Sequence, residues 1–285
     1  MLAAVRRTDS FGRRFSRDGG GLIAAVLLAF LLTISLLAGS LGRGDPFRTS
    51  RQRLQAPSAS HLLGTDDLGR DQFTRILYGA RTSLLVGLTV SLLSTTIGVV
   101  VGGVASYAGG LLDDGLMRIT EFFQIVPRFF AALVVAAIFG ARLATVILIL
   151  GLTSWTVTAR ILRAEVLSIK QREFITAAAV LGADGTRLLW RHILPNALSP
   201  VIVTASLQVG GAILAEAGLA FLGIGDRTVV SWGSMLQAAQ PFARAAPWLA
   251  IAPGLGITVT VLAVNRLGDA LNDARSPRRL RRRNQ

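Results

Sequence analysis

The chain contains no cysteine, so disulfides, thiolate nucleophiles and zinc–thiolate sites are excluded. Histidine is almost as scarce, because only His61 and His192 occur, far apart and outside any HExxH pattern. The phosphate-binding pattern GxxxxGKS/T is also missing, so the sequence offers no P-loop for ATP. These absences leave little chemistry for a membrane-embedded enzyme.

Charge is the next scarce property. Charged residues make up 16% of the chain, whereas soluble domains carry about 25%. Hydrophobic residues reach 52% and the mean hydropathy is +0.55. The apolar residues form several blocks long enough to cross a bilayer core about 30 Å thick, which takes about 20 helical residues. The composition predicts an all-α protein that crosses the membrane several times.

The net charge of +14 comes from arginines between and beyond the apolar blocks. They gather in residues 6–17, 43–81, 160–191 and 275–283. Nucleic-acid binding would also explain a basic chain. We favour the interpretation that these arginines set topology beside anionic lipid.

Six spans are expected, near residues 19–42, 84–107, 116–140, 143–161, 196–222 and 246–267. An even number places both termini on one side, and the arginines of three regions put that side in the cytoplasm. The 43–81 region disagrees, since it carries seven arginines and would lie outside. Three regions outweigh one. The expected organisation is a cytoplasmic tail (1–18), a first transmembrane helix (19–42), an external loop (43–81), a five-helix core (82–272) with a cytoplasmic loop at about 164–195, and a basic tail (273–285).

Within the 43–81 region we expect a short helix lying at the membrane surface. Thr65, Asp66 and Asp67 are candidate caps for its start, and Phe73 and Ile76 begin its apolar face. The aspartates do not follow a calcium-loop pattern, so no metal site is predicted there.

Residues 170–195, KQREFITAAAVLGADGTRLLWRHILP, form a charged island between apolar spans. A helix is expected from Glu165 to Leu181, ended by Gly182 in a left-handed conformation. Asp184 can cap a second helix, and Pro195 begins a new direction. Three consecutive alanines at 177–179 give the first helix a smooth surface, which indicates a docking site for another protein.

The 170–195 segment resembles the EAA signature of binding-protein-dependent ABC importer permeases. Ala177, Ala178, Gly182, Leu194 and Pro195 fit that signature, while Thr176 and His192 depart from it. Other stretches resemble the second permease of dipeptide, oligopeptide and nickel importers in the same order along the chain. They are GTDDLGRD (64–71), YGARTSLLVG (78–87), RHILPNALSP (191–200), GGAILAEAGLAFLGIG (210–225), SWGSML (231–236) and the stretch 246–274.

The resemblance implies the type I importer permease fold, in the inner membrane of a bacterial cell. It implies a second permease, two cytoplasmic ATPases and an external solute-binding protein as partners. ATP and magnesium would belong to the ATPases, and this chain would bind no cofactor and catalyse no bond change. The implied ATPase-coupling residues are Glu173, Phe174, Thr176, Ala177, Ala178, Gly182 and Pro195.

The cargo implied first is a di- or oligopeptide, with nickel, haem or another small ligand as the alternative. Gln124, Gln208 and Glu216 are candidates for the translocation path or its gate. The alternative, that Gln208 and Glu216 bond between helices or lie at an interface, stays open. A secondary transporter is the rival of another class, but it would usually show repeated halves, and no internal repeat is visible.

Overall fold

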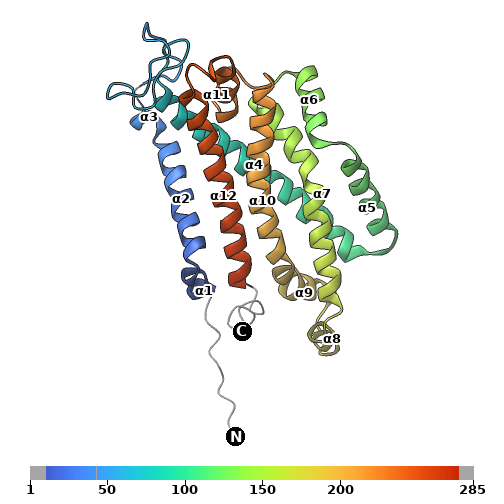
Figure 1. Cartoon of the computed structure of the whole chain (residues 1–285). Helices are drawn as coiled ribbons and strands as arrows, with labels where there is room; N and C mark the ends of the chain where they lie inside the picture. Colours follow the sequence, from blue (N-terminus) through green and yellow to red (C-terminus); the bar gives the residue numbers. More distant parts are fainter. Residues whose placement is uncertain (1–10, 43, 276–285) are drawn as a thin grey trace.

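The computed structural model describes residues 11–42 and 44–275, and this part of the chain is almost entirely helical. The bundle and the order of its helices are visible in Figure 1. The helices are α1 (Phe11–Arg17), α2 (Gly19–Leu36), α3 (Ala38–Leu41), α4 (Gln72–Ala108), α5 (Gly110–Ile125), α6 (Arg128–Phe139), α7 (Leu143–Lys170), α8 (Glu173–Val180), α9 (Gly185–Leu188), the π-helix η1 (Leu189–Ile193), α10 (Leu194–Phe221), α11 (Trp232–Ala239), the 3-10 turn η2 (Gln240–Phe242) and α12 (Trp248–Arg275).

Five helices of the described chain are long and apolar enough to cross a membrane: α2, α4, α7, α10 with η1, and α12. The third expected span, near residues 116–140, is present only as the pair α5 and α6, which meet at an angle of 76°. The break falls at Val126 and Pro127, both in extended conformation. A proline disfavours helical geometry in the residue before it and cannot donate a backbone hydrogen bond, so the span bends here.

α4 lies at the centre of the bundle and packs against α7 on one side and α10 on the other. α12 covers α10, and α2 packs against α12 at the edge (Figure 1). Small residues allow the closest crossing, since a Cβ atom at Gly98 would lie 2.7 Å from the carbonyl oxygen of Trp155 in α7. Gly102, one turn further along α4, is similarly tight against Ala159. Close packing through small residues is a common way for membrane helices to associate.

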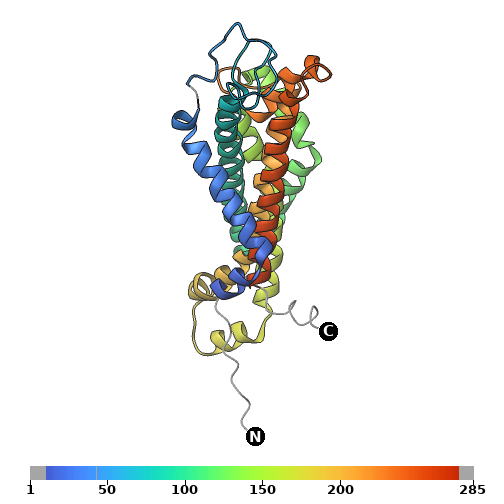
Figure 2. The same ribbon diagram turned by 60° about the vertical axis from the view of Figure 1, so that its left-hand side comes forward.

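The bundle has two distinct ends. α1, α8, α9 and the last turns of α12 lie at one of them, here called the α8 end (Figures 1 and 2). The opposite end, the α11 end, carries α11 and the 44–71 loop, as both views show. The first described helix, the last turns of α12 and the 170–195 segment therefore all lie at the same end of the molecule.

Two expected boundaries need correction. The helix expected at the membrane surface is the first part of α4, which runs 37 residues without interruption and has Asp71, rather than residues 65–67, at its N-cap. The helix expected over residues 165–181 is divided, because α7 ends at Lys170 and α8 begins at Glu173. The connection between the expected spans 196–222 and 246–267 also contains a helix, α11, which Ser231 and Ser234 stabilise as a capping box.

Candidate functional site: the 170–195 segment and two adjoining cavities

The 170–195 segment leaves the bundle at the end of α7 and returns at the start of α10. Gly182 has a φ of +84°, which confirms the expected left-handed turn. The backbone N–H of Ala183 donates to the carbonyl oxygen of Ala178 at 3.1 Å, and that of Leu181 donates to Ala177 at 3.1 Å. These bonds satisfy the last carbonyls of α8, as glycine-terminated helix ends usually do. The turn sends the chain into α9 and η1.

α8 is anchored by one side chain and exposes most of the others. Ile175 is buried with residues of α7 and α10, which holds the helix against the bundle. Val180 and Leu181 are 82% and 88% exposed, which is unusual for aliphatic side chains in an aqueous segment. A groove of about 530 Å³ runs along α8 and is lined by Gln171, Glu173, Thr176, Ala177, Val180 and Leu181.

Five of the seven predicted coupling residues lie on α8, and most of these are exposed. Glu173, Phe174, Thr176 and Ala177 are exposed, and Ala178 is half-buried behind them. Pro195 is exposed in the first turn of α10, on the far side of the π-helix η1. A π-helix contributes an extra residue to a helical turn and often marks a functional position.

Two cavities adjoin each other beside α7. The larger, of about 830 Å³, lies between α5 and α7 and has mostly charged or polar walls. The smaller, of about 580 Å³, reaches the bend between α5 and α6 and the middle of α10. Val157 and Ile161 of α7 line both cavities, so the two spaces adjoin along these side chains.

Gln124 and Gln208, two of the three predicted path residues, each line one of these cavities. Arg160 Nη1 donates to Gln124 Oε1 at 2.8 Å across the larger one. The amide oxygen of Gln208 accepts from Ser94 at 2.6 Å, and its nitrogen donates to Thr158 at 3.0 Å, so Gln208 also joins α4, α7 and α10. The Gln208 side chain thus lines the smaller cavity and also forms hydrogen bonds between helices.

Glu216 lies apart from both cavities. Its side chain is 5% exposed, and its Oε2 is buried without a hydrogen-bond partner. The structure thus brings two of the three predicted path residues into one hollow region and leaves Glu216 outside it.

Sequence reasoning missed most of the charged wall. Arg118, Glu121 and Arg160 line the larger cavity, and none of them is among the predicted path residues. Arg163 also lines it and forms a two-bond ion pair with Asp113, at 2.6 and 2.7 Å. The available signal was the three-to-four-residue spacing of charges in α5 at 114, 118 and 121, which places them on one helical face.

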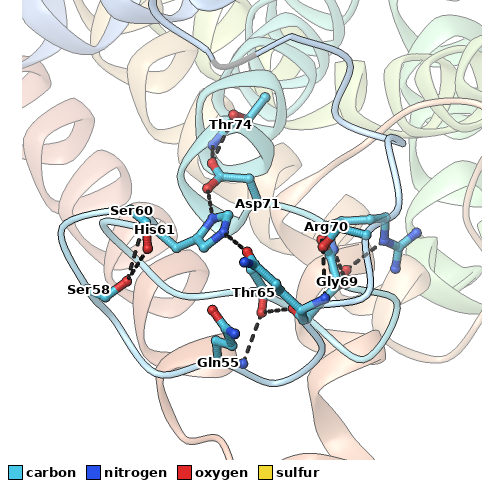
Figure 3. Close-up of polar contacts among 12 residues, drawn as sticks. Gln55, Ser58, Ser60, His61, Thr65, Gly69, Arg70, Asp71 and Thr74 are labelled. Atoms are coloured by element: carbon cyan, nitrogen blue, oxygen red, sulfur yellow. Dashed lines mark hydrogen bonds and ion pairs between the residues drawn. The ribbon is translucent and has the colours of Figure 1, made fainter.

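A second polar network organises the 44–71 loop at the α11 end (Figure 3). His61 bridges Asp71 and Gln52, with its Nδ1 2.9 Å from Asp71 Oδ2 and its Nε2 2.7 Å from Gln52 Oε1. Thr65 is fully buried and donates its hydroxyl to the carbonyl of Gln52 at 2.6 Å. Because Asp71 also caps α4, the loop is joined directly to the start of that helix.

The pKa of Asp71 should make this junction sensitive to acid. Burial raises that pKa, but the hydrogen bonds from His61 and from the backbone and hydroxyl of Thr74 outweigh it and hold the pKa below its ordinary value. A carboxylate with a lowered pKa stabilises the fold above its unfolded pKa, about 3.9, and loses that contribution as the pH falls through the folded value.

We therefore expect the thermal midpoint of the purified protein to fall below about pH 4, and this step to be smaller in Asp71→Asn. Asp67→Asn is the matched control, since Asp67 is 34% exposed and lies 3.9 Å from Arg70 Nη2. Identical pH profiles for Asp71→Asn and the unmodified chain would contradict the assignment.

The comparisons with known proteins agree with this arrangement. Residues 94–281 match the family model of the binding-protein-dependent transport system inner membrane component. A putative peptide transport system permease protein of Brucella abortus is 40% identical over 268 residues, covering 93% of this chain and 90% of the relative. The oligopeptide transport system permease protein OppC of Bacillus subtilis is 34% identical over 267 residues, covering 93% and 88%.

Among solved structures, the MetNI methionine ABC transporter in an inward-facing conformation contains a chain of similar fold. Its TM-score is 0.56 at 18% sequence identity, with 69% of this chain and 96% of that chain covered. This likeness shows a shared fold. Membership of a family is shown by the family model and by the sequence relatives. With two thirds of its length in the family model and relatives aligned over nearly all of it, the chain belongs to the family of binding-protein-dependent transport system inner membrane components.

Proposed function

We propose that this chain is one of two permease subunits of an ATP-driven importer that carries di- or oligopeptides. An external solute-binding protein delivers the cargo, and two ATPases on the opposite side drive the transport cycle. Relatives named as peptide, dipeptide and oligopeptide permeases support the choice of cargo. The observation that carries the mechanism is the exposed apolar surface of α8, supported by Gly182 and projecting from the end of the bundle.

The proposal assigns a side to each end of the molecule. The α8 end faces the cytoplasm, with the basic tails, and the α11 end faces outwards. ATP and magnesium belong to the ATPase partners, and this chain contributes movement and a path. The two adjoining cavities form its half of that path, with Gln124 and Gln208 in the walls. The bend between α5 and α6 lies beside this path, since Pro127 and Arg128 line the smaller cavity.

The decisive experiment reconstitutes the chain in liposomes with its cognate second permease, ATPases and binding protein. ATP-dependent uptake of a radiolabelled dipeptide is expected, and mass spectrometry of the co-purified binding protein should identify peptide. Recovery of nickel or haem on that protein would mean that the cargo is nickel or haem and not a peptide. Uptake driven by an ion gradient without ATPases would reject the importer assignment in favour of a secondary transporter.

Replacing Gly182 by valine is expected to separate hydrolysis from uptake. A Cβ atom here meets no neighbour within 4 Å, so the change causes no clash. Its cost is the left-handed backbone, about 1–2 kcal/mol for an ordinary residue and more for a β-branched one. That strain loosens the end of α8, so we expect uptake to fall about tenfold while membrane insertion and ATP hydrolysis continue.

Gly182→Asn is the control, because asparagine tolerates the left-handed region and should retain most of the uptake. Uptake and hydrolysis are measured on the same liposomes, so their ratio does not depend on the amount inserted. Normal uptake by Gly182→Val would remove this turn from the coupling assignment.

A further inference from the structure

The chain carries 30 basic residues, and Lys170 is the one lysine among them. It is the last residue of α7, where the chain leaves the bundle for α8. The other 29 basic residues of the sequence are all arginines. An ammonium group differs from a guanidinium because it is compact and presents three donors on a flexible stem.

Lys170 reaches across to the end of α4. Its Nζ donates to the carbonyl oxygen of Ser106 at 2.6 Å and lies 6.0 Å from the centroid of the Tyr107 ring. Ser106 is buried two residues before α4 ends at Ala108. Carbonyl groups in a last helical turn lack partners within the helix and carry partial negative charge, so a cation is favourable here. The ring adds a cation–π attraction.

The same end of α4 also meets the segment on its return. A Cβ atom at Gly185, the first residue of α9, would lie 3.7 Å from the Tyr107 hydroxyl. Lys170 precedes α8 and Gly185 follows Gly182, so the end of α4 binds the chain before the exposed α8 surface and lies close to it afterwards. Ile175 adds a separate apolar anchor beneath it.

We propose that Lys170 is the positioning residue that fastens the 170–195 segment to α4, through the Ser106 carbonyl and the Tyr107 ring. The proposal rests on the function proposed above, because it concerns how a displacement of α8 enters the bundle. α4 is 37 residues long, and at its opposite end, the N-cap Asp71, His61 joins it to the 44–71 loop. A displacement applied at Lys170 is therefore delivered to a central helix that reaches both ends of the molecule.

The first test compares uptake per ATP hydrolysed in the reconstituted transporter. Lys170→Met keeps the stem and removes the charge and all donors, so this ratio is expected to fall about tenfold. Lys170→Arg retains charge and donors and should recover more than half of the ratio, which a merely space-filling role would not predict. Arg244→Met, at an exposed position of the α11 end, is the control for loss of a positive charge. An unchanged ratio in Lys170→Met would overturn the proposal.

The second test does not depend on transport, because an amine-selective acylating reagent has one lysine side chain to modify in this chain. The Arg244→Lys variant adds an exposed reference lysine to the same molecule. In the intact complex Lys170 is expected to react about tenfold more slowly than the introduced lysine, since its Nζ is engaged. Equal rates at the two positions, measured by mass spectrometry of the separate peptides, would show that the contact is absent.

The two tests separate the two proposals. A complex without ATP-driven uptake, in which Lys170 is nevertheless protected, would contradict the importer function and leave the junction standing. Coupled uptake in the wild type and in Lys170→Met alike would confirm the function and reject the role of Lys170.

Discussion

Gly102→Ala is expected to lower the free energy of unfolding by about 3 kcal/mol, the upper end of the usual cost of overpacking. The added Cβ would overlap the Ala159 carbonyl oxygen and lie 3.0 Å from its Cα. Backbone atoms cannot move aside as a side chain can, so the α4–α7 crossing must open. Gly102→Leu should yield little folded protein, because α4 and α7 form the most extensive helix pair.

Gly103 provides the matched control one residue away. A Cβ atom there meets only Leu162 Cδ2, at 3.9 Å, which is ordinary van der Waals contact. Gly103→Ala should therefore leave the protein as stable as the original, because alanine is a better helix former. The stability of both variants is measured by thermal unfolding in detergent, monitored by size-exclusion chromatography. Equal loss in the two variants would mean that the close crossing at Gly102 does not set the effect.

The second large effect is expected at Asp66, which holds two guanidinium groups at the α11 end. The Asp66 side chain is 4% exposed, and its Oδ2 accepts from Arg70 Nε at 2.6 Å and from Arg75 Nη1 at 2.9 Å. Arg75 is also buried, and its Nε has no partner. Removing the carboxylate charge leaves a buried cation uncompensated, which typically costs about 3–5 kcal/mol.

Asp66→Asn keeps the shape of the side chain and removes its charge, so it isolates this contribution. We expect a lower thermal midpoint together with faster proteolysis of the 44–71 loop, since the Asp66 carboxylate ties this loop to Arg75 in the first turn of α4. Asp67→Asn should change neither property, because Asp67 is more exposed and contacts Arg70 only at 3.9 Å. A stable Asp66→Asn protein with a protected loop would show that Arg75 finds another partner.

These contacts mark the limit of prediction from the sequence. The spans can be predicted from the length of the apolar blocks, because that length must match the thickness of the hydrocarbon layer. The turn at Gly182 can be predicted because few residues other than glycine adopt a positive φ. The bend at Pro127 was less accessible, since prolines also occur within continuous membrane helices. Pro200 and Pro253 do so in this chain, inside α10 and α12.

The candidate site was predictable in its local part only. The surface of α8 follows from a short stretch of sequence, and its alanines and Gly182 could be identified there. The ion pair of Arg163 with Asp113, and the bond of Lys170 to Ser106, join residues 50 and 64 positions apart. Such pairs depend on how helices cross, and hydrophobic periodicity carries no information about that. Two of the seven arginines of the 43–81 region acquire a structural role in the same way, since Arg70 and Arg75 pair with Asp66.

The length of α4 has a consequence for the surrounding lipid. At 1.5 Å per residue its 37 residues span about 55 Å, whereas the hydrocarbon layer is about 30 Å thick. The helix crosses the bundle obliquely in Figure 1, and tilt is an inexpensive way for a long helix to adapt to its bilayer. Lipids with longer or shorter acyl chains therefore act on the tilt of α4 first. Acyl-chain length becomes a variable that should alter the turnover rate without any change in the protein.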